Sequence, residues 1–304
     1  MHRTLRCSVI IPTYNRASLL GYTLESLARQ DLSHDLFEVL VVDDGSSDAT
    51  EAVVRSYSDR LDLRYFFQPD EGFRVAAARN IGIKHASGDI CLFVDSGVLL
   101  HTGCVRAHVA SHESVAGPAA VSGYVFCFNL GNEDATQINE FIDVAEPDKS
   151  IDTMRRQGRW LDIREDFYAK YTDDFHSVPA PWYVYWTCNA SARTEQIRAV
   201  GMFDEAFRRW GGEDIDLGYR LHRAGARFFV NRAASALHHP HDKVYDELAN
   251  SALENYRYIA RKYATPITRL LMVEPTISYL KINDIIRTAG LPGCADFLAG
   301  SSDV

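Results

Sequence analysis

Residues 78–97, ARNIGIKHASGDICLFVDSG, decide the fold class of this chain. The first half has the apolar spacing of a helix, and the second half holds a short apolar run, residues 89–94, that predicts a buried strand. The run ends on Asp95, which Ser96 and Gly97 follow. A helix that leads into a buried strand with a carboxylate at its end is typical of a parallel sheet covered by helices.

The sequence before this stretch repeats the same alternation. It predicts strands at residues 7–11, 37–42 and 63–68, and helices at residues 17–30, 48–58 and 75–86. Each strand is followed by a polar turn, and open α/β sheets bind ligands at that edge. We therefore expect a nucleotide-type pocket on the turns at residues 12–16, 43–46 and 95–97.

The rest of the chain is less regular. Residues 124–180 are polar and without a clear period, which predicts long loops with short helices over an acceptor. The aromatic run WYVYW, residues 182–186, alternates as a strand does, so two of its four rings should point into the core. Further helices are expected at residues 194–200, from 213 to Gly225, at 244–263 and in the tail, with a strand at 227–230.

Composition limits the function classes. The chain has 304 residues, of which 46% are hydrophobic, and a net charge of −9, which argues against a nucleic-acid partner. No apolar run approaches the roughly 20 residues of a membrane helix, and the first residues do not resemble a secretion signal. The six cysteines are scattered without a CxxC pair. We expect a cytoplasmic protein with reduced, buried cysteines and no membrane span.

The turns carry side chains suited to a nucleotide. Asp44 ends a strand just before a helix start, where a carboxylate can accept hydrogen bonds from a base or a ribose and the helix favours phosphate. A capped turn is the alternative explanation. Arg79 could bind a diphosphate or hold Asp95 in place, and a surface arginine on an amphipathic helix is its alternative.

Four segments, SVIIPTYNR, VVDDGSSD, ARNIGIKHASGDICLFVD and GMFDEAFRRWGGEDIDLGYRLHRAG, occur in order along the chain. Together they resemble an inverting nucleotide-sugar glycosyltransferase of family 2 with the GT-A fold. The last segment is similar to one shared by β-1,4-galactosyltransferases and chondroitin-polymerase-type enzymes. The resemblance covers roughly residues 5–126 and 182–243.

The resemblance implies roles for the matching residues. On the nucleotide side, Pro12, Thr13 and Tyr14 would line the base site. Asp44 would contact uracil or its ribose, and Asp95 would face ribose and metal. On the acceptor side, Trp210 would line the acceptor, Glu213 would orient it and Asp214 would be the catalytic base. Arg16 and Ser96 on the turns and Arg79 on the preceding helix are further nucleotide-binding candidates. Gly212 before the acid pair and Trp182 and Trp186 of the aromatic run are further acceptor-binding candidates.

The chemistry also requires a base. Inverting transfer is a single in-line displacement at the anomeric carbon, so the acceptor hydroxyl must lose its proton as the diphosphate leaves. Glu213 and Asp214 are adjacent on a helix and point in different directions, so they cannot share one role. Acids that only favour a helix N-terminus are the alternative.

The metal site departs from the family pattern. Gly97 stands where the family has its second metal-binding acid, so a requirement for Mn²⁺ or Mg²⁺ is in doubt. By resemblance, His239 would bind the metal, with His238 and His241 as neighbouring alternatives and Lys243 able to meet phosphate. Asp95 and a histidine could hold a cation together with phosphate oxygens, or side chains alone could hold the diphosphate.

We therefore expect an α/β protein of the GT-A type with a nucleotide-sugar-binding half (1–123), an acceptor-binding and catalytic half (124–265) and a helical tail (266–304). It would transfer a hexose-type sugar from a nucleotide diphosphate, UDP above all, to a hydroxyl of a small molecule, a peptide or a glycan. A catalytically silent sugar-nucleotide or glycan-binding module is one alternative. A nucleotidyltransferase is another, but IPTYNRASLL is not the Gly-rich basic loop that it would need.

Overall fold

A computed structural model describes residues 6–128, 133–241, 245–273, 276–294 and 296–297. Within these ranges the strands form one eight-stranded sheet in the order β3-β2-β1-β4-β7-β6-β8-β5. Their bounds are β1 Cys7–Thr13, β2 Phe37–Asp43, β3 Leu63–Phe67, β4 Ile90–Val94, β5 Val98–Leu100, β6 Ala119–Phe126, β7 Asn189–Arg193 and β8 Arg227–His238.

The N-terminal half of the sheet is parallel, as predicted. β1 lies between β2 and β4 and pairs in parallel with both, and β3 adds to the far side of β2. The helices between these strands are α1 (Ala17–Ala28), α2 (Thr50–Arg55) and α3 (Val75–His85). All four predicted strands and three predicted helices of this region are confirmed, with ends that differ by up to three residues.

The other half of the sheet mixes directions. β7 pairs antiparallel with β4 on one side and with β6 on the other, while β8 runs parallel to β6 and antiparallel to β5. The sequence analysis did not predict β5, β6, β7 or helix α4 (Cys104–Glu113), and it expected only residues 227–230 of β8. β6 also runs across residue 123, where we placed the border between the two halves, and that division stays a prediction.

The two faces of the sheet bury separate apolar clusters, because neighbouring strand residues point to opposite sides. On one face, Ile10, Leu40 and Phe93 pack with residues of α3 and of α9 (Glu213–Arg223). On the other, Val9, Val39 and Leu92 pack with residues of α1 and α4. Packing on both faces of the sheet therefore fixes β1 and β4, and it also fixes the start of the turns that follow these strands.

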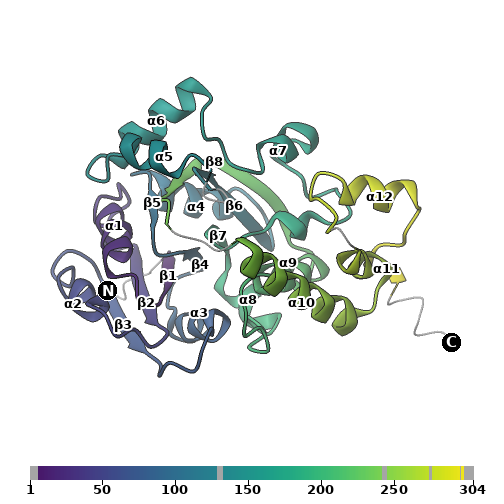
Figure 1. Cartoon of the computed structure of the whole chain (residues 1–304), viewed down its shortest axis with the longest axis horizontal. Helices are drawn as coiled ribbons and strands as arrows, with labels where there is room; N and C mark the ends of the chain where they lie inside the picture. The colour runs from purple at the N-terminus through teal and green to yellow at the C-terminus, as the bar shows by residue number, and fades with distance from the viewer. Residues whose placement is uncertain (1–5, 129–132, 242–244, 274–275, 295, 298–304) are drawn as a thin grey trace.

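Helices and loops make up the rest, and those within residues 124–180 are short, as predicted. They are α5 (Ala135–Phe141), α6 (Pro147–Gln157) and α7 (Glu165–Tyr171), then the 3₁₀ turn Pro181–Val184, α8 (Thr194–Ala199), α10 (Tyr245–Tyr263), α11 (Pro266–Arg269), the 3₁₀ turn Leu270–Met272 and α12 (Ile282–Thr288). Figure 1 shows β1 to β3 at one end of the molecule and α11 and α12 at the other. The expected frayed end, residues 299–304, lies outside the described residues.

Two expectations from composition can be compared with the structure. Within the described ranges, no helix has the length and apolar character needed to cross a membrane. All six cysteines are buried and none forms a disulfide, as predicted.

Candidate active site

The turns after β1, β2 and β4 lie together at the carboxyl edge of the parallel strands. The backbone N–H of Asp44 donates to the carbonyl of Thr13 at 2.9 Å, and Ser96 Oγ donates to the carbonyl of Pro12 at 3.2 Å. The end of β1 is therefore hydrogen-bonded to both neighbouring turns. The structure brings together the predicted nucleotide-binding residues of three separate segments.

Asp44 is buried and already holds two partners. One carboxylate oxygen accepts from the side-chain amide of Gln68, and the other accepts from the backbone N–H of Arg74 at 2.8 Å. Burial raises the pKa of Asp44. A carboxylate fixed in this way keeps its orientation, but a base or a ribose would have to share oxygens that Gln68 and Arg74 already use.

Within the described ranges, Tyr14 offers an exposed ring and Thr13 an unpaired hydroxyl beside this carboxylate. The Tyr14 ring is 45% exposed, and its hydroxyl donates to Asp70 at 2.8 Å. Thr13 Oγ1 is buried and has no hydrogen-bond partner among the described residues. Because buried hydroxyls are nearly always paired, Thr13 Oγ1 suits a ligand that brings a polar atom to this edge.

At Gly97 the expected acid is absent, and the backbone conformation also directs this position away from the site. Gly97 has φ +98°, and an added Cβ would lie 3.5 Å from side-chain atoms of Leu19 on α1. The backbone N–H of Gly97 donates to Thr23 Oγ1, also on α1, at 2.9 Å. In this backbone conformation a side chain at position 97 would point toward α1, on the face of the sheet that the helix covers.

Histidines reach the same edge from the end of β8. The backbone N–H of His239 donates to the carbonyl of Gly97 at 2.8 Å, and the His239 ring lies 5.3 Å from the ring of Tyr22. His241 Nε2 lies 3.0 Å from Arg16 Nη1, and the rings of His238 and His241 are 5.1 Å apart. The structure thus brings Arg16 and the three histidines close to the turn that carries Asp95. Lys243 lies outside the described residues.

The cation site is incomplete by side chains alone. Among the described residues there is no group of three or more His, Cys, Asp or Glu side chains placed to hold a metal ion. Asp95 and His239 would contribute one carboxylate and one imidazole, both acceptable to Mn²⁺, and oxygen atoms of a diphosphate would have to complete the shell. The donor set therefore fits a cation only in company with the nucleotide.

Arg79 joins two acids instead of facing the open edge. It is 3% exposed, Nη1 donates to Glu213 Oε1 at 2.8 Å, and Nη2 donates to Asp95 Oδ1 at 3.0 Å. These contacts match the second of the two roles expected for Arg79, holding Asp95, and they join Asp95 and Glu213 through one guanidinium. The exposed-arginine alternative is wrong, because Arg79 is buried.

Asp214 lies beside this bridge at the start of α9 and is partly buried. Burial, with the adjacent charge of Glu213, raises the pKa of Asp214 to about 7, against the opposing effects of Arg79 and of backbone N–H groups. One of these N–H groups, that of Ile215, donates to Asp214 Oδ1 at 2.8 Å. A carboxylate with a pKa near neutrality can take up and release a proton under ordinary conditions.

The two acids differ in their contacts, as their adjacency predicted. Glu213 Oε2 is buried and has no hydrogen-bond partner among the described residues. Trp210, three residues before Glu213, is 36% exposed, and Gly212 forms the left-handed N-cap of α9 with φ +95°. Trp210 is thus available to a ligand next to the acid pair, and Glu213 keeps one oxygen unpaired.

The aromatic run at residues 182–186 is not a strand. It forms a 3₁₀ turn that begins at Pro181, whose ring fixes φ and supplies no N–H to a sheet. Trp182 is fully buried and packs edge-on against Tyr219 of α9, so its assignment to acceptor binding is wrong. Trp186 is partly buried between Phe128 and Tyr279, and its role stays a prediction.

Sequence reasoning missed the residues that α10 brings to the site. The Tyr256 ring lies 6.4 Å from the ring of Tyr183, and burial, with smaller contributions from Tyr183, Asp214 and Glu213, raises the pKa of Tyr256 well above its usual value. Asn255 contacts the backbone just before the pair. Neither residue belongs to a recognisable motif, because their role depends on how α10 packs against α9.

Comparisons with known proteins agree with this geometry. The family model for glycosyl transferase family 2 matches residues 8–171, and the model described as the N-terminal domain of galactosyltransferase matches residues 172–242. The structure of TarS from S. aureus, residues 1–349 in complex with UDP-GlcNAc, is similar with a TM-score of 0.65 at 19% identity, over 92% of this chain and 75% of that one. The predicted GT-A fold is thereby confirmed.

Relatives with similar sequences are named glycosyltransferases. Validoxylamine A glucosyltransferase from Streptomyces hygroscopicus subsp. jinggangensis is 38% identical over 86% of this chain and 62% of its own length. Chondroitin synthase from Pasteurella multocida is 31% identical over 78% of this chain but only 25% of its own length. The chain therefore spans about three fifths of the former and a quarter of the latter. Because the family model matches more than half of its residues, the chain belongs to glycosyltransferase family 2.

Proposed function

We propose that this protein is an inverting glycosyltransferase that moves a hexose-type sugar from a UDP-sugar to a hydroxyl, with Asp214 as the base. The observation that carries the proposal is the partly buried Asp214, with its pKa raised to about 7, beside a bridge that links Glu213 through Arg79 to Asp95 at the nucleotide edge. This arrangement supports the proposal, because Asp214 would then be a proton acceptor next to the bound donor.

The step is a single displacement with balanced charges. The acceptor oxygen forms a bond to the anomeric carbon, its proton passes to the Asp214 carboxylate, and the electron pair of the broken glycosidic bond stays on the diphosphate. A single displacement inverts the anomeric configuration. Glu213 Oε2, unpaired among the described residues, would accept a hydrogen bond from another acceptor hydroxyl, and Trp210 would pack against the sugar ring.

We propose that a divalent cation, Mn²⁺ or Mg²⁺, would be held by Asp95 and His239 with diphosphate oxygens. Such an ion supplies positive charge to the leaving group. Arg79 is committed to two carboxylates, so among the described residues Arg16, beside His241, is a nearby cation that could also meet the diphosphate. UDP release measured with EDTA and with added Mn²⁺ tests this point, since activity that is indifferent to both would assign the diphosphate to side chains alone.

The donor and the acceptor define the main experiment. UDP release should be screened with UDP-glucose and UDP-GlcNAc, because a relative is a glucosyltransferase and TarS has been solved with UDP-GlcNAc. Small-molecule, peptide and glycan hydroxyl acceptors, validoxylamine A among them, complete the screen. A chain that binds UDP but transfers no sugar from any donor would be a silent binding module, and the proposal would fail.

The variant Asp214→Asn tests the base. We expect it to keep UDP affinity and to lower turnover by roughly 10²–10⁴-fold, because the amide has no basic oxygen. The matched control is Asp173→Asn, which removes an exposed acid that pairs with Arg232 away from the site. Turnover that falls equally in both variants would remove the assignment of Asp214.

A further inference from the structure

Helix α10 packs directly on the turn that leads into the acid pair. Both family models end before this helix, the first at residue 171 and the second at residue 242. Asn255 on α10 is 8% exposed, and its side-chain amide nitrogen donates toward the carbonyls of Arg209 at 3.1 Å, Trp210 at 3.3 Å and Gly211 at 2.5 Å. One side chain thus ties three consecutive backbone carbonyls together.

The turn needs such a donor because of its backbone geometry. Gly211 and Gly212 both have left-handed φ, +87° and +95°, which lets successive carbonyls converge on one side. An added Cβ would lie 3.1 Å from Ala252 Cβ at Gly211 and 3.2 Å from Asn255 Cβ at Gly212, so α10 touches the turn with no intervening space. Without the amide, converged carbonyl dipoles would repel one another.

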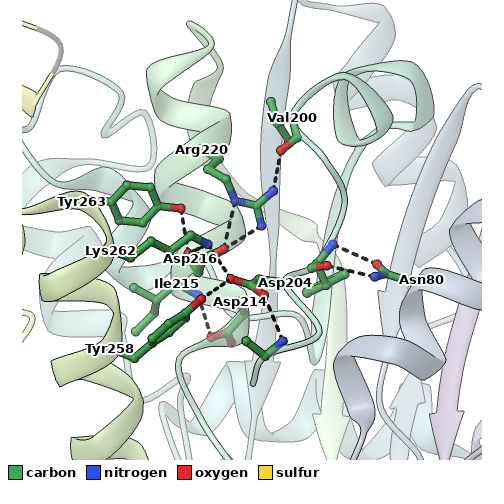
Figure 2. Close-up of polar contacts among 12 residues, drawn as sticks. Asn80, Val200, Asp204, Asp214, Ile215, Asp216, Arg220, Tyr258, Lys262 and Tyr263 are labelled. Atoms are coloured by element: carbon green, nitrogen blue, oxygen red, sulfur yellow. Dashed lines mark hydrogen bonds and ion pairs between the residues drawn. The ribbon is translucent and has the colours of Figure 1, made fainter. Parts of the chain in front are cut away.

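The same helix also binds the first turn of α9 beyond the acid pair, as Figure 2 shows. Asp216 is fully buried and accepts from Lys262 Nζ and Tyr263 Oη of α10, both at 2.7 Å. Lys262 also donates to Asp204 at 2.7 Å. Together, Asn255 before the acid pair and Lys262 with Tyr263 after it connect α10 to both sides of Glu213 and Asp214.

We propose that α10 is the positioning element of the acid pair, and that Asn255 is a positioning residue for Trp210, Glu213 and Asp214. This inference rests on the proposed transferase function. Asn255 contacts the backbone of the turn and not the acids, so it acts by fixing where α9 begins and how Trp210 faces the site. Its hydrogen bonds reach the turn before α9 and not the turns after β1, β2 and β4, so we expect the nucleotide edge to keep its shape without them.

The kinetic test compares Asn255→Ala with a matched control. Asn231→Ala removes an amide that joins β8 to Ala107 and Ser111 of α4, seven positions along β8 from His238. We expect N255A to lower kcat by about 10-fold to 100-fold, since small misplacements of reacting groups cost that much, and to leave the Kd for UDP unchanged. N231A should keep kcat near the wild-type value. Equal kcat in the two variants would overturn the proposal.

A second measurement needs no turnover. The chain has four tryptophans, so 5-fluorotryptophan labelling gives four fluorine resonances, and Trp210→Phe identifies the one from Trp210. We expect N255A to shift or broaden that resonance alone and N231A to leave it unchanged. An unchanged Trp210 resonance in N255A would refute the positioning role. A wild-type chain without transferase activity would refute the proposed function, while the resonance still decides the role of Asn255.

Asn255→Ser covers the case in which N255A does not fold. A serine hydroxyl keeps one donor in place of the amide, so we expect a smaller loss of kcat and a smaller change of the Trp210 resonance than any variant without a donor. Wild-type kcat together with a wild-type Trp210 resonance in N255S would contradict a requirement for the amide at this turn.

Discussion

Replacing Arg79 with methionine should destabilise the protein more than the loss of any surface ion pair. Arg79 and Glu213 have side chains only 4% and 8% exposed, and their contact measures 2.8 Å. Removing one partner of a buried pair leaves an uncompensated charge and costs about 3–5 kcal/mol. The contact of Arg79 with Asp95 should add little, because the Asp95 side chain is 39% exposed and solvent screens it.

Urea unfolding followed by tryptophan fluorescence measures this loss. The double variant Arg79→Met with Glu213→Gln should regain about 1–3 kcal/mol over R79M, because the remaining side chain then carries no buried charge. Arg227→Met serves as control, since Arg227 pairs with Asp174 at the surface and its loss should cost at most about 1 kcal/mol. The reasoning is refuted if R79M is as stable as R227M, or if Glu213→Gln restores nothing in the R79M background.

Three further predictions concern the site. Because Asp214 must be ionised to act as a base and has a pKa of about 7, kcat/KM should rise with pH up to about 7 and level off above it; a flat profile between pH 5 and 8 would argue against this base. Trp182→Ala should lower the free energy of unfolding by about 3–5 kcal/mol, while Trp210→Ala should leave stability within about 1 kcal/mol and raise the KM for the acceptor; thermal melts and acceptor titrations separate the two, and equal stability losses would contradict the burial difference. Gly97→Asp should lower the melting temperature, by roughly 2–4 °C for each kcal/mol of backbone strain, because position 97 has a positive φ. It should not increase the stimulation of activity by Mn²⁺, because the new side chain would point toward Leu19. A gain in Mn²⁺ stimulation would refute that orientation.

The N-terminal half of the fold could be predicted from sequence because its signals are local. Each of its parallel strands is an apolar run between polar turns, and the alternation with helices leaves few arrangements. The nucleotide-binding candidates follow from the same pattern, since they end the strands. These residues lie at one edge because the strands pair in parallel. The register of β1 with β2 and β4 confirms the parallel pairing.

The remainder depends on tertiary packing that no local pattern records. Aromatic alternation at residues 182–186 suggested a strand, but Pro181 and contact with α9 produce a buried 3₁₀ turn. Arg79 appeared to be a candidate for the diphosphate, and only the approach of α9 to α3 shows that it pairs with Glu213. Asn255 could not be identified at all, because an asparagine in a helix has no distinctive spacing.

The position of β7 determines how this protein can move. β7 is hydrogen-bonded along β4 on one edge and along β6 on the other, so the strand that leads to Asp95 and the strands of the second half share one continuous ladder. Swinging one half away from the other would break that ladder. For the proposed transferase, we therefore expect substrate entry and product release to use local loop motions over a rigid frame, and gating during turnover should be sought there.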